Sequence, residues 1–477
     1  MLGCLPLSCR GAGMDTAQAP RFTYQKVHRY LCDWLDAQPH GQVHRLPSLR
    51  EVSRRLRVSL SSSKQAFALL EAQGRILSRP KVGYFSVPRA PTMLLAPSAS
   101  LVDRVFASAR QPGMLALSSD APSVLAALEH PLAMIERELL RQAQRSESPP
   151  YQPCGEPELR EALARRYSRG LEDHWQADQV FIGADLRSML ELALRALVPA
   201  GAVALVESPC SWLVLRQLRL AGLQIVEVPL DGQGRFDLDA MAHVLADMQV
   251  RVAVLSSAVN MPQGGVMPAE DKQRLCTLLA RHQVWLFEND SYGALCPTQP
   301  RYRDHADPQR LLVFASFDKC IGAEAPFGYL LCRQTTMLAQ ALVARGFRLP
   351  AYRQRAIAQL LSSGRLDHHL QSLTGQLAAS QARMAHLLQR HAADCLRLVL
   401  PVAGPAFWLQ AARPVDMDTV CEQLLAAGIV IAPGSVFSQA GHWRDYLRLS
   451  FTVDWRQDIE GALIKLAQVI RQAPQLP

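Results

Sequence analysis

The sequence lacks cysteine pairs at the spacings used for metal binding or redox chemistry. Its 11 cysteines are scattered, and no two of them are separated by two residues. Neither a disulfide framework nor a zinc site is indicated, and we expect no bound metal. Because structural disulfides are rare in a reducing compartment, this cysteine usage favours a cytoplasmic protein.

The sequence also lacks any apolar run close to the ~20 residues that a membrane-spanning helix requires. We therefore expect no membrane contact, although 49% of the residues are hydrophobic and can form sizeable cores. The N-terminus has a short apolar patch at Leu5–Leu7 but no secretory signal. We expect residues 1–20 to form a disordered tail, and Met14 is as good a start of translation as Met1. At about 150 residues per domain, the length indicates about three domains.

Acidic residues are scarce in one part of the chain only. Residues 21–90 contain 13 Lys+Arg and 4 Asp+Glu, a balance of +9 that equals the net charge of the whole chain. The remaining 407 residues are therefore neutral overall. A small, strongly basic module attached to a neutral body indicates contact with nucleic acid.

The basic module has the pattern of a winged helix-turn-helix. The apolar spacing predicts a helix over Tyr24–Ala37, and Ser48 with Glu51 forms a capping box that begins a second helix ending near Arg57. A third helix is predicted over Leu60–Gln73 with four residues facing inward, which are Ala66, Phe67, Leu69 and Leu70. Ile76–Val87 then alternates as a hairpin with Gly83 at its tip. A small protein-interaction domain would have similar helices, but neither the charge nor the hairpin.

The order of these elements resembles the GntR-type DNA-binding domain. The segments that carry the resemblance are LPSLREVSRRLRVS, LLEAQGRI and RPKVGYF. The resemblance implies that Arg50 contacts a phosphate or a base edge, and that the third helix enters the major groove through Ser61, Ser62, Lys64 and Gln65. Arg79 and Lys81 on the hairpin would hold the DNA backbone or the minor groove. The alternative for each Arg or Lys is a solvated surface charge.

One departure from the GntR pattern lies at the start of the recognition helix. The family commonly has Arg and Thr-Val there, whereas this chain has Leu60, Ser62 and Ser63. The DNA sequence that is read should differ accordingly.

A tether separates the basic module from the rest of the chain. Pro88–Ser100 is rich in Pro, Ala and Ser, and its prolines favour extended backbone. We place a winged-helix domain at 21–88, a linker at 89–120, a large domain at 121–390 and a small α/β domain at 391–477.

From Tyr151 onward, helices alternate with short apolar strands, which is typical of a mostly parallel α/β sheet. The predicted strands are Gln179–Ile182, Ala202–Val206, Gln224–Val228, Val250–Ser256, Val284–Glu288, Leu311–Ala315 and Phe327–Leu331. Active sites in such sheets gather at the carboxyl ends of the strands. Polar residues that follow strands directly are Glu207, Asn260, Asp290 and Lys319.

Lys319 is the strongest single candidate for chemistry in this body. It lies in a small-residue loop between two apolar, strand-forming runs, Leu311–Phe314 and Phe327–Leu331. Buried lysines can act as Schiff-base amines toward carbonyls. The alternative is a loop lysine that pairs with Asp318.

The surrounding segments resemble fold-type I pyridoxal-phosphate aminotransferases. Ser316 with Lys319 resembles the Ser-x-x-Lys signature of the cofactor lysine, and further matches are Tyr151 with Gly155, Glu207 with Pro209, Pro433 with Gly434, and Leu447–Phe451. The segment Glu288–Gly293 resembles E-x-D-x-Y-G, which implies that Asp290 pairs with the cofactor ring nitrogen and that Tyr292 touches the 3′ oxygen. Arg448 would hold an α-carboxylate. The predicted cofactor site also includes Ala184, Asp185, Arg187 and Asn260.

Several positions depart from the aminotransferase pattern, and most concern the phosphate. Pro326 stands where the family has a phosphate-binding arginine, and Asp318 stands where a serine precedes the lysine. Asp185 brings a carboxylate into the phosphate cup, where Arg187 could compensate. Met261 displaces the usual asparagine to Asn260. Two gained acids that face a phosphate and a lost arginine would weaken its binding by several kcal/mol.

Together the two halves resemble the MocR subfamily of bacterial GntR-type transcription regulators. The resemblance implies a homodimeric, DNA-binding regulator whose aminotransferase-like body senses pyridoxal 5′-phosphate or an amino-acid or amine ligand. Two alternatives remain: an active aminotransferase with an appended winged helix, and a ligand-free body that only pairs two winged helices.

Overall fold

The computed structural model describes residues 23–36, 43–72, 75–79, 82–86, 99–111, 113–119, 121–143, 150–170 and 174–475. The chain divides into two compact units, Met1–Ala96 and Pro97–Pro477. The predicted tail at 1–20 and most of the tether lie outside the described residues.

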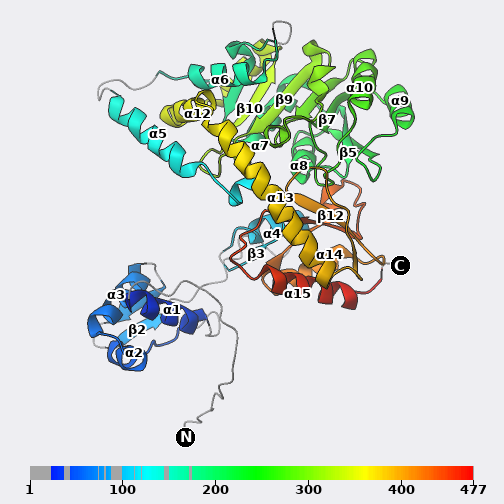
Figure 1. Ribbon diagram of the computed structural model, residues 1–477. Helices are drawn as coiled ribbons and strands as arrows, with labels where there is room; N and C mark the ends of the chain where they lie inside the picture. Colours follow the sequence, from blue (N-terminus) through cyan, green and yellow to red (C-terminus); the bar gives the residue numbers. More distant parts are fainter. Residues whose placement is uncertain are drawn as a thin grey trace. The chain divides into compact units, whose positions relative to one another are not determined.

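Three helices and a hairpin form the N-terminal unit, as the sequence predicted. The helices are α1 (Thr23–Asp36), α2 (Leu49–Leu56) and α3 (Leu60–Ala72), and the hairpin pairs β1 (Ile76–Arg79) with β2 (Gly83–Ser86) (Figure 1). Ser48 caps α2 by accepting a hydrogen bond from the backbone N–H of Glu51 at 3.3 Å. Arg57 ends the helix in the left-handed region, at φ 53°.

The wing has a third segment that the sequence did not reveal. The backbone N–H of Leu46 donates to Tyr84 O at 2.9 Å, and that of Ser86 donates to His44 O at 2.8 Å. Arg45 pairs with Phe85 as an isolated bridge, and its guanidinium donates to Val82 O at 2.8 Å. The residues before α2 therefore extend the hairpin along its outer edge.

A single apolar core holds this unit together. Val27 and Leu31 from α1, Val52 from α2, and Phe67 and Leu70 from α3 are buried against one another. The prediction that Leu69 faces inward is wrong, because that side chain is 38% exposed. Ser63 is buried on this helix instead, and its hydroxyl accepts a hydrogen bond from Ser53 Oγ at 2.8 Å.

The C-terminal unit contains a seven-stranded sheet in the order β4-β10-β9-β8-β7-β5-β6. All seven predicted strands are present, as β4 (Val180–Gly183), β5 (Val203–Ser208), β6 (Gln224–Pro229), β7 (Val250–Ser256), β8 (Trp285–Asn289), β9 (Leu311–Ser316) and β10 (Gly328–Cys332). Only β10 runs antiparallel to its neighbours. The predicted mostly parallel α/β sheet is confirmed.

Helices cover both faces of this sheet, because its strands are apolar on both sides. On β9, Leu312 and Phe314 belong to one core, with α7 (Leu186–Leu197), α8 (Trp212–Leu220) and α11 (Thr335–Arg345). Leu311 and Val313 belong to the other core. The helices of that side are α6 (Pro157–Tyr167), α9 (Leu238–Asp247), α10 (Ala269–Arg281) and α12 (Ala351–Ser362), and α5 (Glu129–Gln142) packs on α12.

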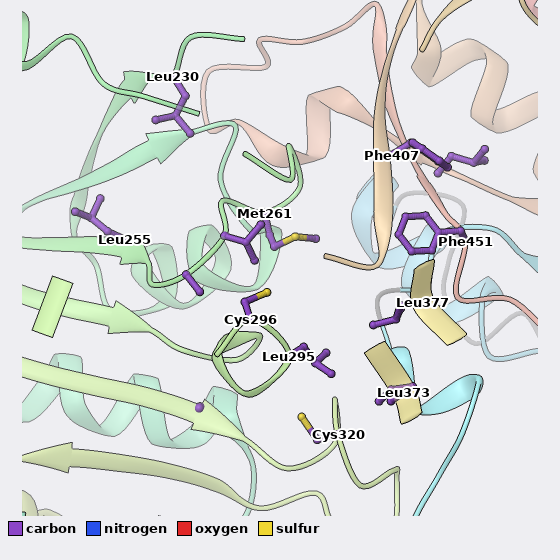
Figure 2. Packing of buried hydrophobic residues seen from close by; sticks show 14 of the residues in the cluster. Leu230, Leu255, Met261, Leu295, Cys296, Cys320, Leu373, Leu377, Phe407 and Phe451 are labelled. Carbon is purple, nitrogen blue, oxygen red and sulfur yellow. The ribbon is translucent and has the colours of Figure 1, made fainter. Parts of the chain in front are cut away.

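A smaller layer follows the large sheet. Its four strands are β11 (Leu396–Arg397), β12 (Ala406–Ala411), β15 (Tyr446–Ser450) and β14 (Ala432–Pro433), in that order, with α14 (Met417–Ala426) and α15 (Ile459–Gln472) packed together beside them. The long α13 (Arg365–His391) runs between the two layers (Figure 1). Figure 2 shows that one apolar core is continuous between them, with Met261 lying between Leu255 and Phe451.

The structure differs from the predicted linker at residues 101–116. Leu101–Ser108 forms α4, and β3 (Leu115–Ala116) pairs in parallel with β13 (Ile429–Val430). These elements lie beside the small layer in Figure 1. These elements are only eight and two residues long, so the sequence did not mark them as part of the body.

No helix among the described residues has both the length and the apolar character needed to cross a membrane.

The exposure of Leu69 yields a matched pair of variants. We expect Phe67→Ala to destabilise the N-terminal unit by about 3–5 kcal/mol, because it empties a fully buried position. Leu69→Ala on the same helix should cost less than about 0.5 kcal/mol. Hydrogen exchange in the full chain, followed in peptides from α1 and α3, measures both. Equal effects would contradict the packing described above.

Candidate functional site

A cavity of about 340 Å³ lies at the carboxyl ends of the parallel strands. Asn289 at the end of β8 and Ser316 at the end of β9 lie in its wall. Among the predicted site residues, the wall brings together six, which are Asp185, Arg187, Tyr292, Ser316, Lys319 and Arg448. Residues far apart in the sequence thus meet where an open α/β sheet binds its ligands.

Lys319 both lines the cavity and pairs with its neighbour. Its Nζ lies 3.4 Å from Asp318 Oδ2, and its side chain is 15% exposed. Asp318 also accepts a hydrogen bond from Ser316 Oγ. An aldehyde reacts with the neutral amine of a lysine. The structure thus shows the pairing of Lys319 with Asp318, and the Schiff-base role of Lys319 stays a prediction.

Asp290 is turned away from the cavity. Its Oδ2 accepts a hydrogen bond from Tyr167 Oη at 2.9 Å and lies 3.2 Å from Arg303 Nη2. Its Oδ1 is 3.6 Å from Arg301 Nε. Burial raises the pKa of Asp290, but the guanidiniums of Arg303 and Arg301 outweigh it and leave that pKa below its usual value. Asp290 is thus an ion-paired carboxylate of the interior.

Asn289 occupies the cavity wall beside it. Its Oδ1 accepts hydrogen bonds from Ser291 Oγ at 2.6 Å and from Ser291 N at 3.2 Å. Successive residues of a strand point to opposite sides, so the last residue of β8 and the residue after it cannot both face the cavity. A neutral amide, not a carboxylate, is presented there. The period of two along β8 could have revealed this, since Asn289 continues the face of Trp285 and Phe287, which pack in one core while Leu286 packs in the other.

The phosphate side of the predicted site carries a carboxylate of its own. Asp185 lines the cavity and caps α7 by accepting a hydrogen bond from Ser188 N at 2.9 Å. A helix N-terminus is where an anion would bind, so Asp185 competes for this position. Asp318 and Pro326 lie in the wall as well, so the three departures that concern the phosphate all line the cavity.

Cations nevertheless outnumber acids in the wall. Its described residues include five cationic side chains, which are Arg110, Arg187, Arg216, Lys319 and Arg448, and two acidic ones, which are Asp185 and Asp318. Arg216 is paired outside this set with Asp103, at 2.5 Å. The wall retains an excess of positive charge that favours an anionic ligand.

Arg448 projects into the cavity from the small layer. It lies on β15, opposite Trp408 on β12 and Ala432 on β14. Its guanidinium donates to Ser118 O and lies 5.0 Å from the centre of the Phe437 ring. The side chain is 4% exposed, so it is a buried cation suited to a carboxylate.

Besides Asp290, two further predicted cofactor residues, Asn260 and Ala184, do not line the described cavity wall. Asn260 Nδ2 donates instead to Glu207 Oε2 at 2.9 Å, and Glu207 also accepts from Ser256 Oγ. Met261 and Pro262 face the cavity in place of Asn260. Asn260 thus holds the loop that carries Met261 and Pro262 through its hydrogen bond to Glu207.

The sequence missed the part of the wall that α4 and α8 supply. Phe106 and Arg110 come from α4 and the residues after it, and Trp212 and Arg216 from α8. The rings of Phe106 and Trp212 meet edge to face at 5.1 Å, and the guanidinium of Arg110 lies 3.4 Å from the Phe106 ring. Phe106 and Arg110 were missed because α4 follows a proline-rich tether.

The candidate nucleic-acid interface is in the N-terminal unit. Arg50, Ser61, Lys64, Gln65 and Arg79 are exposed, and Arg79 stacks over Phe85 at 4.8 Å. Ser62 is half-buried and its hydroxyl bonds to Ser59 Oγ at 2.9 Å. Lys81 lies outside the described residues.

The exposed fractions of Leu60 and Ser63 explain the departure from the GntR pattern at the start of α3. Leu60 is 51% exposed, whereas Ser63 is fully buried. Leu60 therefore belongs to the outward surface of the recognition helix, where an apolar side chain can contact a thymine methyl group. Ser63 belongs to the contact with α2.

Comparison with known proteins matches both parts of the chain. The aminotransferase class I and II family model matches residues 112–462. The uncharacterized HTH-type transcriptional regulator YdcR of Escherichia coli is 28% identical, covering 94% of this chain and 99% of that protein. The probable rhizopine catabolism regulatory protein MocR of Rhizobium meliloti is 24% identical, covering 85% of this chain and 86% of that protein. The resemblance to MocR-type regulators predicted from the sequence is confirmed.

Solved structures show the fold of the body. The α-aminoadipate aminotransferase LysN of Thermus thermophilus superposes with a TM-score of 0.68 at 21% identity, covering 79% of this chain and 95% of that one. The multiple substrate aminotransferase of Thermococcus profundus gives 0.69 at 19% identity, covering 80% and 96%. The predicted fold-type I architecture is confirmed.

Glu207 makes the stability of the folded protein depend on pH. Burial raises the pKa of Glu207 to about 7, against hydrogen bonds from Ser256 and Asn260 that lower it. The folded state therefore holds a proton that the unfolded state releases near pH 4.5. This contribution to stability is fully present below the unfolded pKa and is lost as the pH rises through about 7.

We expect the wild type to lose up to about 3 kcal/mol between pH 4.5 and 8 relative to Glu207→Gln. Denaturant midpoints at the two pH values measure this difference, and Glu270→Gln, at an exposed position of α10, is the control. Parallel pH profiles for wild type and Glu207→Gln would show that Glu207 is already ionised in the folded protein.

Proposed function

Because the chain belongs to the aminotransferase class I and II family, we propose that its body binds a pyridoxal-phosphate-type ligand and that the whole protein is a DNA-binding transcription regulator. The observation that carries this proposal is the fusion of a basic winged helix with a ligand cavity that keeps Lys319. Regulators that match over 94% of this chain support it. The homodimer and the cytoplasmic location expected from the sequence are part of the proposal.

Pyridoxal phosphate supplies an aldehyde and an electron-accepting ring when it is bound. The residues of the cavity fit its aldehyde and its charge: Lys319 offers an amine, Tyr292 and Ser316 offer hydroxyls, and the wall has an excess of cations. Arg187, at the start of α7, is the residue best placed to offset Asp185 near the phosphate. Lys319 would hold the aldehyde carbon through its Nζ, with the carbonyl oxygen leaving as water.

The ring nitrogen would meet a residue other than the predicted Asp290. Asp290 is engaged with Tyr167 and Arg303, and Asn289 faces the cavity. An amide cannot keep a pyridine nitrogen protonated as a carboxylate does, and a neutral ring is a weak electron acceptor. We therefore propose binding without transamination, which favours the regulator over the aminotransferase alternative.

The N-terminal unit would dock as a winged helix. Helix α3 would enter the major groove through Leu60, Ser61, Lys64 and Gln65, and Arg50 at the start of α2 would contact the backbone or a base edge. Arg79, held against Phe85, would contact the backbone from the wing. The third candidate function, a ligand-free dimer frame, would leave the cation-rich cavity without a role.

DNA binding is tested on the segment upstream of the protein's own gene. We expect Arg50→Ala to weaken binding about tenfold or more, and each lost phosphate contact to lower the salt slope by about 1. Arg281→Ala, an exposed arginine of α10, is the matched control. Mobility shifts at several salt concentrations measure both. Equal affinities for the two variants would remove Arg50 from the interface.

Ligand binding is tested with pyridoxal phosphate. After borohydride reduction we expect a covalent adduct on Lys319, seen by mass spectrometry, that Lys319→Ala abolishes and Lys465→Ala keeps, because Lys465 is exposed on α15. We expect more labelling by pyridoxal phosphate than by pyridoxal, and a smaller preference in Arg187→Gln. Sustained turnover of an amino donor with a keto acid would instead favour the aminotransferase alternative.

A further inference from the structure

A second chamber of about 610 Å³ adjoins the cavity at Lys319. The two share several wall residues, including Phe106, Trp212, Lys319, Phe437 and Arg448. A ligand held at Lys319 and Arg448 therefore has space to extend on this side. We call this second space the apolar chamber.

The wall of the apolar chamber is mostly hydrophobic. Besides the shared aromatic rings, it includes a group of aliphatic side chains, which are Val102, Val105, Met114, Val124, Val436 and Val453. Two further carboxylates in the wall already have partners. Asp454 is paired with Arg456 at 2.7 Å, and Glu129 accepts from the backbone N–H of Glu324 at 3.3 Å.

Helix α4 forms one side of this chamber and is held by ion pairs at two consecutive residues, Asp103 and Arg104. Val102, Val105 and Phe106 face the chamber. Asp103 pairs with Arg216 on α8, and Arg104 pairs with Glu422 on α14. The hydrogen bond from Arg104 lowers the pKa of Glu422, so both partners are charged. α4 thus bridges the large and small layers.

The same helix begins directly after the tether. Leu101 is the first residue of α4, and the chain that leads to the N-terminal unit ends one residue before it, at the N-cap Ser100. A shift of α4 moves the point at which the tether leaves the body. A ligand that contacts α4 can therefore act on the DNA-binding unit through the chain itself.

We propose that the apolar chamber holds the hydrophobic side chain of an amino-acid ligand, and that its occupancy is transmitted to the tether through α4. This inference rests on the proposed regulator function. Arg448 would take the carboxylate, Lys319 would lie beside the reacting end, and the aliphatic wall would exclude polar side chains. The effector class is a small amino acid with an aliphatic or aromatic side chain.

Chain length provides the first test. The full chain is titrated by calorimetry, in the presence of pyridoxal phosphate, with L-alanine, L-norvaline, L-norleucine and L-2-aminooctanoate, and with L-glutamate as the polar counterpart. We expect affinity to rise about fourfold per buried methylene, with glutamate weaker than norvaline. Affinity that does not rise with chain length, or tighter binding of glutamate, overturns the assignment.

A matched pair on one helix end tests the location. Ala109 lines the apolar chamber, whereas Ala107 does not appear in its described wall. We expect Ala109→Leu to lower norleucine affinity at least tenfold while changing alanine affinity less than threefold, and Ala107→Leu to change neither. Adduct formation at Lys319 reports whether each variant is folded. Unchanged norleucine binding in a folded Ala109→Leu variant overturns the proposal.

Transmission through α4 is tested by breaking its bridge to α14. Arg104→Gln removes the ion pair with Glu422. The control is Arg471→Gln, which removes a similar pair between Arg471, at the end of α15, and Asp394. We expect norleucine to change DNA affinity in the wild type and in Arg471→Gln, and this change to fall at least threefold in Arg104→Gln at equal norleucine affinity. An undiminished change overturns the role of α4. Loss of all DNA binding in the wild type would instead contradict the proposed regulator function.

Discussion

The body of this protein depends on a group of buried charges behind the sheet edge. Glu288 and Asp290 are both buried at the end of β8, and Arg301 and Arg303 neutralise them. Glu288 accepts further hydrogen bonds from Ser257 Oγ at 2.8 Å and from the backbone N–H of Tyr302 at 2.9 Å. Removing one member of such a set leaves an uncompensated buried charge, which costs several kcal/mol. The loop that carries Tyr292 is therefore held rigidly.

This arrangement explains why one predicted role did not fit. The resemblance of Glu288–Gly293 to E-x-D-x-Y-G placed Asp290 at the ring nitrogen, because that pattern has a carboxylate two residues before the tyrosine. Arg301 and Arg303, which pair with Asp290, lie more than ten residues further along the chain. No local sequence pattern links them to Asp290. Lys319 and Ser316 lie in the cavity wall as predicted, since they follow or end a strand that the apolar pattern marks, and Arg448 lies there as the resemblance implied.

The fold itself was largely predictable, and its exceptions have one physical cause. The strands of the large sheet are continuous apolar runs, and the helices of the N-terminal unit carry caps and regular spacing. The misses were α4, β3 and the segment before α2, which are short and gain their stability from contacts with distant residues. Leu69 was misjudged because the buried face of α3 includes a polar residue, Ser63, which bonds to Ser53 on α2.

The same departures that weaken the case for catalysis strengthen the case for sensing. A transaminase gains rate by stabilising charge on the cofactor ring, and the amide at Asn289 gives that up. A sensor needs only differential affinity between two states of the protein. The cavity keeps what affinity requires: an amine, a buried guanidinium, an excess of positive charge and an apolar extension. Helix α4 lines that extension and also begins at the end of the tether. A shift of α4 on ligand binding would therefore be passed along the chain toward the basic module.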